Sequence, residues 1–126
     1  MKVLQVLDQA FRTTVEEQDD TILWLTQSMR GAGADLEVLL SGHAVHYAVQ
    51  SKRQPPFDLG GWCQSQPADL TQDIGRLTEK GVPVYALHED LEERGLADLP
   101  VLPGIEVIKR SSVVALYDKA DQVWHW

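Results

Sequence analysis

Residues 82–96, VPVYALHEDLEERGL, determine how the chain is expected to fold. Residues 82–87 form a run of β-branched, aromatic and aliphatic side chains, which is typical of a strand buried on both faces of a parallel sheet. A helix follows at once. It opens with Glu89 and Asp90, whose carboxylates suit the positive end of a helix dipole, and it ends at Gly95. In an open α/β sheet, the turn after such a strand is where ligands usually bind.

The alternation of strand and helix extends over the whole chain. Apolar runs predict further strands at residues 3–7, 36–40, 105–108 and 122–126. Such alternation is typical of a parallel sheet covered by helices on both faces. We therefore expect one domain, residues 1–126, that forms a three-layer α/β/α sandwich. Its sheet should be five-stranded and mainly parallel, flavodoxin-like in appearance, with the strand order 2-1-3-4-5.

Apolar periodicity and capping residues predict the helices between these strands. The first begins near Thr14 and Glu17, which have the spacing of a capping box, and ends at Gly31. The next two cover residues 43–52 and 69–80, and the last runs from a cap at Ser111 or Ser112 to Tyr117. The expected inward positions of the first three are Ile22, Leu25 and Met29; Ala44, Val45, Ala48 and Val49; and Leu70, Ile74 and Leu77.

Residues 54–67 interrupt this alternation with a stretch rich in glycine and proline that also holds Trp62 and Cys63. A loop of this length in a compact α/β domain is usually functional or disordered. Because it joins two helices, we expect that it can fold over the carboxyl edge of the sheet.

Composition narrows the class of protein. The chain has 19 acidic and 11 basic residues and a net charge of −8, which disfavours binding to a phosphate backbone. No apolar run is long enough for a membrane span, and the first residues lack the pattern of a signal peptide. The one cysteine excludes an intramolecular disulfide. We expect a cytoplasmic protein that binds neither nucleic acid nor membrane.

Right-handed crossovers would bring several polar side chains to one edge of the sheet, where the parallel strands end. Arg12 precedes a predicted helix and could hold an anion there, although ordinary capping by its neighbours is the preferred interpretation. The residues expected at this edge are Asp8, Arg12, Ser41, His43, His46, His88, Glu89 and Asp90.

Cys63 is the first candidate for chemistry. A thiol in a loop near histidines could be a nucleophile or a persulfide carrier, with His43, His46 or His88 supplying charge or accepting its proton. The alternative is a small apolar residue packed beside Trp62, as free cysteines often are.

A metal or nucleotide site has little support in the residues. His43 and His46 could share a metal with His88 or Cys63, but H-x-x-H alone is a weak pattern and helix caps explain it as well. The first loop, QAFRTT, lacks the glycines of a flavin phosphate loop, and no G-x-G-x-x-G or P-loop is present. We expect no metal and no cofactor.

The tail VWHW, residues 123–126, carries two indoles at the end of the sequence. Aromatic side chains there suggest docking, either on the protein's own sheet or on a neighbouring subunit. We predict a homo-oligomer, a dimer or trimer, with Trp124 or Trp126 in the interface. The alternative is a monomer in which both indoles pack against their own helices.

Two stretches, VYALHEDLEERGL at 84–96 and PGIEVIKRSSVVALYDKADQVWHW at 103–126, resemble the end of the DsrE/DsrF/DsrH family, most closely the DsrH and TusB branch. The resemblance implies an α/β/α subunit that assembles with copies of itself or with related subunits. It also implies cytoplasmic sulfur trafficking, in which a cysteine takes sulfane sulfur from a donor protein and passes it to an acceptor. No metal or organic cofactor is implied.

The cysteine of this chain does not occupy the position that the family pattern implies. DsrE-like subunits have it at the end of the strand before the "RRG" helix, where this chain has Leu87 and His88, and DsrH-like subunits have it in the first loop or helix. Cys63 lies in neither place. The leading hypothesis is a sulfur-relay protein, a sulfurtransferase or sulfur carrier, with Cys63 as the sulfur acceptor. The alternative is a non-catalytic structural or regulatory subunit of a DsrE-family oligomer.

Overall fold

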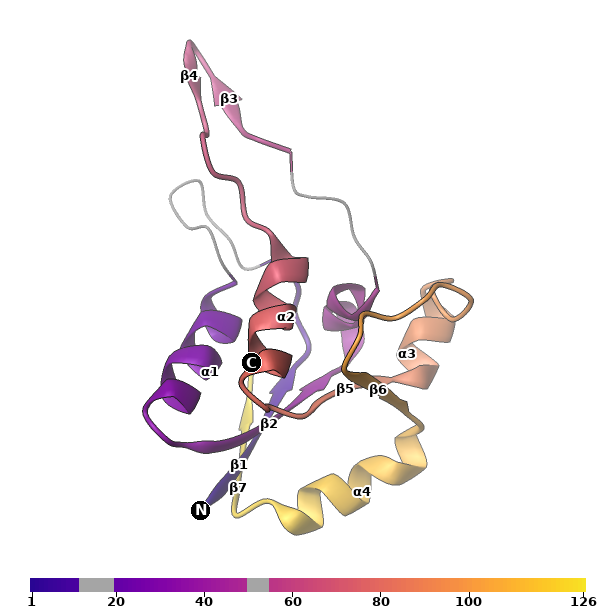
Figure 1. The fold of residues 1–126 in the computed structure, drawn as a ribbon. Helices are drawn as coiled ribbons and strands as arrows, with labels where there is room; N and C mark the ends of the chain where they lie inside the picture. Colours follow the sequence, from indigo (N-terminus) through magenta and orange to yellow (C-terminus); the bar gives the residue numbers. More distant parts are fainter. Residues whose placement is uncertain (12–19, 50–54) are drawn as a thin grey trace.

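The computed structural model of the protein describes residues 1–11, 20–49 and 55–126. The strands of its main sheet are β1 (Lys2–Leu7), β2 (Asp35–Leu40), β5 (Val84–Leu87), β6 (Ile105–Ile108) and β7 (Gln122–His125). All five are parallel, and they lie in the order β6-β5-β2-β1-β7 (Figure 1). The predicted α/β fold with a five-stranded parallel sheet is therefore confirmed.

The other elements connect these strands. They are the helices α1 (Thr21–Gly31), α2 (Leu70–Glu79), α3 (His88–Glu93) and α4 (Arg110–Lys119), the 3₁₀ helix η1 (Gly42–Ala48), and the short strands β3 (Asp58–Leu59) and β4 (Trp62–Cys63). Within the described ranges, no helix has both the length and the apolar character needed to cross a membrane.

The direction of the crossovers decides which face each helix covers. From β1 to β2, β5 and β6 the chain steps in one direction across the sheet, and right-handed crossovers then put α1, η1, α2 and α3 on one face. The last step runs back to β7, so α4 covers the opposite face, apart from the other helices in Figure 1. Two apolar clusters result, a large one under the first four helices and a small one that joins Leu4, Val6 and Leu39 to Leu116. These are the expected three layers.

The predicted strand order 2-1-3-4-5 is wrong. The third strand of the sheet, β5, pairs with β2, and β1 pairs with the last strand, β7. Both orders are compatible with right-handed crossovers and with the same alternation of elements, so the sequence pattern did not distinguish them. In the observed order the loops that leave β5 and β6 turn to opposite faces. The topological switch point therefore lies between these two strands.

Asp20 caps helix α1. Its Oδ1 accepts hydrogen bonds from the backbone N–H groups of Ile22 and Leu23, at 2.9 and 3.1 Å, which satisfies two of the free donors of the first turn. The capping pair predicted at Thr14 and Glu17 lies outside the described residues. The described helix begins at Thr21 and, as predicted, ends at Gly31.

The predicted inward faces are correct for α2 and only partly so for α1. In α2, which Asp69 caps through the N–H of Gln72, the three expected side chains are buried: Leu70, Ile74 and Leu77. In α1 the buried side chains are Ile22, Leu23 and Thr26, whereas Leu25 and Met29 are half-buried. Helix α1 is thus rotated relative to the predicted stripe.

The prediction of an α-helix over residues 43–52 is wrong in the part that the structure describes. The element is the 3₁₀ helix η1, and it ends at Ala48 because Val49 is extended and forms an antiparallel bridge with Val101. The expected inward side chains are nevertheless all buried: Ala44, Val45, Ala48 and Val49. Residues 50–52 lie outside the described ranges.

The loop predicted at 54–67 contains a β-hairpin. Strands β3 and β4 pair in antiparallel fashion through Gly60 and Gly61, whose positive φ angles of 53° and 88° suit a tight hairpin turn. We call residues 55–66 the hairpin arm. Since η1 follows the carboxyl end of β2 and α2 runs back from that end, the arm leaves the body at the carboxyl edge of the sheet. Figure 1 shows it projecting beyond the other elements.

Helix α4 begins at Arg110 and has no serine cap. The preceding residue, Lys109, makes no capping hydrogen bond with its side chain. The carboxylate of Glu89 instead accepts the backbone N–H of Arg110, at 2.8 and 3.0 Å. The predicted cap at Ser111 or Ser112 is therefore wrong, because a carboxylate from α3 takes that role.

Candidate functional site

The carboxyl ends of β1, β2 and β7 meet at Asp8. Ser41, which follows β2, donates a hydrogen bond from its Oγ to Oδ1 of Asp8, and Nε2 of His125 contacts Oδ2 of Asp8. The carboxylate thus lies between the hydroxyl and the imidazole. A Ser–His–Asp relay needs the imidazole in the middle, so this cluster fixes the strand ends together and is not a nucleophilic triad.

Gly42 allows the start of η1 to approach the end of β1. The backbone carbonyl of Asp8 accepts the N–H of His43 at 2.9 Å. A Cβ at position 42 would lie 3.0 Å from that carbonyl oxygen, and the φ angle of Gly42 is +52°. Only glycine adopts this backbone without strain.

A cleft of about 360 Å³ opens beside these strand ends. We call it the histidine cleft; it is lined by Gln9, Ala10, Phe11, His43 and His46. In a 3₁₀ helix, with three residues per turn, side chains at i and i+3 lie on the same side. The H-x-x-H spacing therefore turns both imidazoles of η1 toward one cleft. In an α-helix, with 3.6 residues per turn, the same spacing would align them less closely.

Phe11 forms one wall of the histidine cleft in an unusual conformation. Its φ angle is +60°, a value that bulky side chains rarely adopt and that is often found at functional sites. Its backbone N–H donates to the hydroxyl of Tyr47, which in turn donates to Oδ2 of the fully buried Asp20 at 2.6 Å. Its ring meets Tyr47 edge-on, 5.6 Å between centroids. The buried chain from Asp20 through Tyr47 thus holds the wall in place.

The surroundings of His46 in the histidine cleft favour its neutral form. Partial burial lowers the pKa of His46 below 6.5, and the nearby positive charge of Arg94 and the second imidazole, His43, lower it further. His46 is therefore mainly neutral at pH 7, with one ring nitrogen free to accept a proton.

Asp90 joins the switch point to the same edge. Its Oδ2 accepts the backbone N–H of Gly42 at 2.6 Å, and its Oδ1 lies 3.3 Å from Nη2 of Arg110. Asp90 therefore links α3, η1 and α4. The expectation that Asp8, Ser41 and Asp90 share one edge holds, and each of them has a structural partner there.

The candidates for sulfur chemistry lie on separate elements. Cys63 is exposed on the hairpin arm, where its thiol contacts the carbonyl of Gln64 at 3.8 Å. His43 and His46 line the histidine cleft, and His88 pairs with Glu92 at 3.1 Å on α3. Among the described residues, no interaction joins Cys63 to any of the three histidines. Arg12, expected at the same edge, lies outside those residues.

A protein-only metal site is not formed by the part of the chain that the structure describes. Residues 1–11, 20–49 and 55–126 contain no group of three histidine, cysteine or carboxylate side chains arranged to hold a metal ion. The histidine cleft offers two imidazoles, and two ligands leave a metal weakly held.

Two features of this edge were not found from the sequence. His125 reaches Asp8, whereas the expectation for the tail concerned only its indoles; the rule that parallel strands end at one edge applies to β7 as well. Trp126 contacts the larger core, and its indole binds the buried amide of Gln5. Nothing in the sequence marked Gln5 as a partner.

Comparisons with known proteins support the fold. No family model matches the chain, and a search of curated proteins finds no match. Among solved structures, the crystal structure of the ychN protein from E. coli superposes with a TM-score of 0.74 and 21% sequence identity, covering 99% of this chain and 98% of that one. The chain therefore shares the fold of the ychN protein over nearly its full length.

Proposed function

We propose that this protein is a sulfur carrier of the DsrE/DsrF/DsrH type, which takes sulfane sulfur onto Cys63 as a persulfide and passes it to another protein thiol. The observation that carries the proposal is the position of Cys63. It is the one cysteine of the chain, and it is exposed on a hairpin that projects from the carboxyl edge. The shared fold with ychN and the resemblance of residues 84–96 and 103–126 to that family agree with it.

The chemistry is an exchange without net oxidation. The Cys63 thiolate attacks the outer sulfur of a donor persulfide, R–S–SH; a sulfur–sulfur bond forms to Cys63 as the donor's own sulfur–sulfur bond breaks. The donor leaves as a thiolate, and Cys63 holds the extra sulfur. The thiolate of an acceptor protein then attacks the outer sulfur held on Cys63. The extra sulfur moves to the acceptor, and Cys63 leaves as a thiolate. Such exchanges depend on the thiolate fraction and on access to the sulfur.

The hairpin arm makes the sulfur of Cys63 accessible to other proteins. Donor and acceptor must each bring a cysteine within bonding distance of the same sulfur atom. An exposed thiol on a narrow projection meets protein partners with less steric hindrance than a thiol in a cleft. The exposed indole of Trp62, on the other face of β4, offers an apolar contact surface on the same arm.

His43, His46 and His88 remain the proposed supporting groups. A neutral imidazole can accept the proton that the thiol loses, and the lowered pKa of His46 keeps it neutral at pH 7. Because no contact joins these histidines to Cys63 among the described residues, this role requires either a partner or a second copy of the chain.

Mass spectrometry tests the carrier role. The protein is incubated with a persulfide donor, separated from it without reductant and weighed intact. A gain of one sulfur atom in the wild type and none in Cys63→Ser is expected. An unchanged wild-type mass, or an equal gain in Cys63→Ser, would remove the carrier role.

A non-catalytic subunit of an oligomer is the second candidate. The observation that favours it is apolar exposure on the hairpin arm, where Phe57, Leu59 and Trp62 are 45%, 66% and 49% exposed. Titration of the native protein with a thiol reagent separates the two candidates. Fast reaction at neutral pH in the assembled protein supports the carrier, whereas a thiol covered by a neighbouring subunit reacts slowly.

A further inference from the structure

The histidine cleft lies at the edge of the sheet where ligands of α/β proteins bind. Its lining residues follow β1 and β2 in the chain, at the carboxyl ends of these strands, and open parallel sheets bind ligands outside those ends. Its volume of about 360 Å³ falls within the range for small-molecule pockets, roughly 300–1,000 Å³. Position and size therefore suit one small ligand.

The aromatic wall of the cleft is held in place without a ligand. Phe11 has a φ angle of +60°, which costs free energy in a bulky residue and persists only where the surroundings enforce it. Here its backbone N–H donates to the hydroxyl of Tyr47, and that hydroxyl donates to the buried Asp20. The ring of Phe11 is nevertheless 50% exposed. The protein thus maintains an open aromatic surface at this wall.

His43 and His46 present hydrogen-bonding groups to the same space. They are three residues apart in the 3₁₀ helix η1, and both line the cleft. A neutral imidazole has one N–H donor, and a protonated imidazole has two. A carboxylate has two oxygens that accept hydrogen bonds, so a single carboxylate can bind both rings.

The charges that act on this pair are positive, in a chain with a net charge of −8. Arg94 and His43 both lower the pKa of His46, which means that the potential at its ring is positive. The lining of the cleft contains no carboxylate. An anion is therefore attracted to this place, although the molecule as a whole repels anions.

The carboxylates on the neighbouring elements have other partners. Asp8, Asp20 and Asp90 each accept hydrogen bonds within the protein, and among the described residues none of these bonds comes from His43 or His46. Glu93 lies 3.7 Å from Arg94, but its side chain is 67% exposed, so solvent screens this pair. The positive charge beside the cleft is therefore left available to a ligand.

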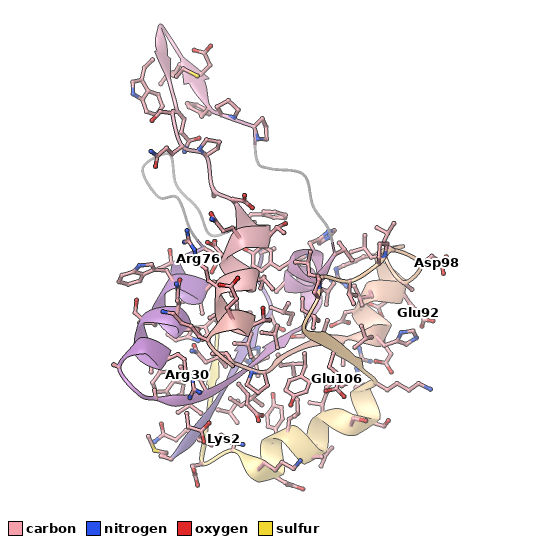
Figure 2. The ribbon with its side chains drawn as sticks, viewed as in Figure 1. Lys2, Arg30, Arg76, Glu92, Asp98 and Glu106 are labelled. Carbon is pink, nitrogen blue, oxygen red and sulfur yellow. The ribbon has the colours of Figure 1, made fainter. Side chains whose placement is uncertain are left out.

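We infer that the histidine cleft binds a small aromatic carboxylate, with the carboxylate at His43 and His46 and the aromatic ring against Phe11. The inference does not rest on the proposed function, because Cys63 is not part of the lining. Figure 2 shows the side chains of the hairpin arm, which holds Cys63, standing clear of the body. Sulfur loading and carboxylate binding are separate measurements, so either can fail without the other.

An NMR titration with three probes tests the ligand class. Benzoate has both the ring and the carboxylate, benzamide has the ring without the charge, and acetate has the charge without the ring. We expect benzoate to shift the ring protons of His43 and His46 saturably, and to bind at least about tenfold more tightly than benzamide and about fivefold more tightly than acetate. The ring protons of His88, which lies on α3 outside the lining, should move little.

Each comparison can contradict the inference. Equal affinities for benzoate and benzamide would remove the anion site, and equal affinities for benzoate and acetate would remove the aromatic contact. No saturable shift with benzoate would overturn the inference as a whole.

The pKa of His46 provides a second readout in the same titration. A bound carboxylate favours the protonated imidazole, so saturating benzoate should raise this pKa, whereas benzamide should leave it unchanged. A pKa of His46 that stays the same or falls with bound benzoate would place the carboxylate elsewhere and overturn the inference.

Variants matched in charge locate the site. Arg94→Gln should weaken benzoate binding by about three- to tenfold, and Arg94→Lys, which keeps the charge, should bind like the wild type. The control is Arg30→Gln, which removes a positive charge near the end of α1, far from the hairpin arm in Figure 2. Equal effects of Arg94→Gln and Arg30→Gln would contradict binding in the cleft.

Removal of both imidazoles is the most stringent test. His43→Gln/His46→Gln should abolish saturable benzoate binding, followed in this variant by the backbone amide signal of Phe11. The remaining amide signals of the same spectrum show whether the variant is folded, and the Arg94 variants test the site independently. An unchanged affinity in the folded double variant would overturn the inference.

Discussion

The indole Nε1 of Trp126 donates a 2.9 Å hydrogen bond to the side-chain oxygen of Gln5, which is completely buried on β1, next to the edge strand β7. The amide nitrogen of Gln5 donates in turn to Thr26 on α1 at 2.7 Å. One buried amide thus connects the end of the chain, the first strand and the first helix. The apolar docking expected of the tail occurs, for Trp126, on the protein's own core.

Removing the amide at Gln5 should therefore destabilise the protein. Gln5→Met keeps the size of the side chain but leaves the indole N–H of Trp126 without its acceptor, and we expect a loss of about 1–3 kcal/mol in the free energy of unfolding. The matched control is Gln122→Met, because Gln122 accepts an indole hydrogen bond from Trp124 at an exposed position; its effect should stay within about 0.5 kcal/mol. Urea denaturation followed by tryptophan fluorescence measures both. Equal effects would contradict a structural role for the buried pair.

Gly42 should tolerate no side chain. Alanine there adds a Cβ against the carbonyl of Asp8 and forces a left-handed backbone, so Gly42→Ala is expected to cost about 1–3 kcal/mol of unfolding free energy. Gly75 is the control, since it lies inside α2 and a Cβ added there would meet no side chain or neighbouring element within 4 Å. Gly75→Ala should stabilise the protein by about 0.5–1 kcal/mol through helix propensity. Thermal or urea unfolding measures the change in unfolding free energy of the two variants. Equal changes would contradict the close approach of η1 to the end of β1.

Local pattern was sufficient for most elements and insufficient for their arrangement. Residues 105–108 were predicted as a strand with the observed bounds, because alternation and flanking turns are encoded locally. The pairing of β5 with β2 is not encoded in this way, since backbone hydrogen bonds between parallel strands are the same for any neighbour. The hairpin at Gly60–Gly61 could have been predicted, because two glycines between short apolar runs indicate a tight turn.

The pKa of His46 should depend on the charge of Arg94. Burial, then Arg94, then His43 lower this pKa below 6.5. Removing the positive charge in Arg94→Gln should raise it, whereas Arg94→Lys should keep it low, because a cation disfavours the protonated imidazole. An NMR titration of the ring protons measures the pKa in each variant, with Arg30→Gln as a distant control. An unchanged value in Arg94→Gln would show that Arg94 does not contribute to the lowered pKa.

The carboxylate of Glu89 should give a defined pH dependence of stability. Hydrogen bonds from its own backbone N–H and then from that of Arg110 lower its pKa below the ordinary value of 4.5. A carboxyl whose folded pKa is depressed stabilises the fold above its unfolded pKa and loses that contribution as pH falls through the folded pKa. Glu89→Gln should therefore be less stable than wild type at neutral pH, and the difference should shrink in acid.

Urea denaturation at neutral pH and in a series of buffers from pH 4.5 downward follows this difference as the pH passes the folded pKa of Glu89. Glu79→Gln, at an exposed position in the last turn of α2, is the control and should differ little from wild type at either pH. A gap between wild type and Glu89→Gln that stays constant with pH would contradict the capping of α4 by Glu89.

The candidate site was predicted in part. The sequence placed Asp8, Ser41 and Asp90 at one edge, because the rule for parallel strands needs only their positions after strands. The sequence pattern predicted that the loop with Cys63 could fold over this edge, near the histidines. In the structure the loop is a projecting hairpin, and Cys63 lies apart from them. The prediction also treated His43 and His46 as α-helical, and the 3₁₀ geometry that aligns them depends on packing of η1 in the core.

The rate at which Cys63 takes up sulfur tests the central claim most directly. Wild type and Glu79→Cys/Cys63→Ser each present one exposed thiol, and each is mixed with the same persulfide donor and weighed intact over time. The carrier role predicts that the wild type gains one sulfur atom well before the control variant does. Equal rates, or a wild type that gains none, would contradict it.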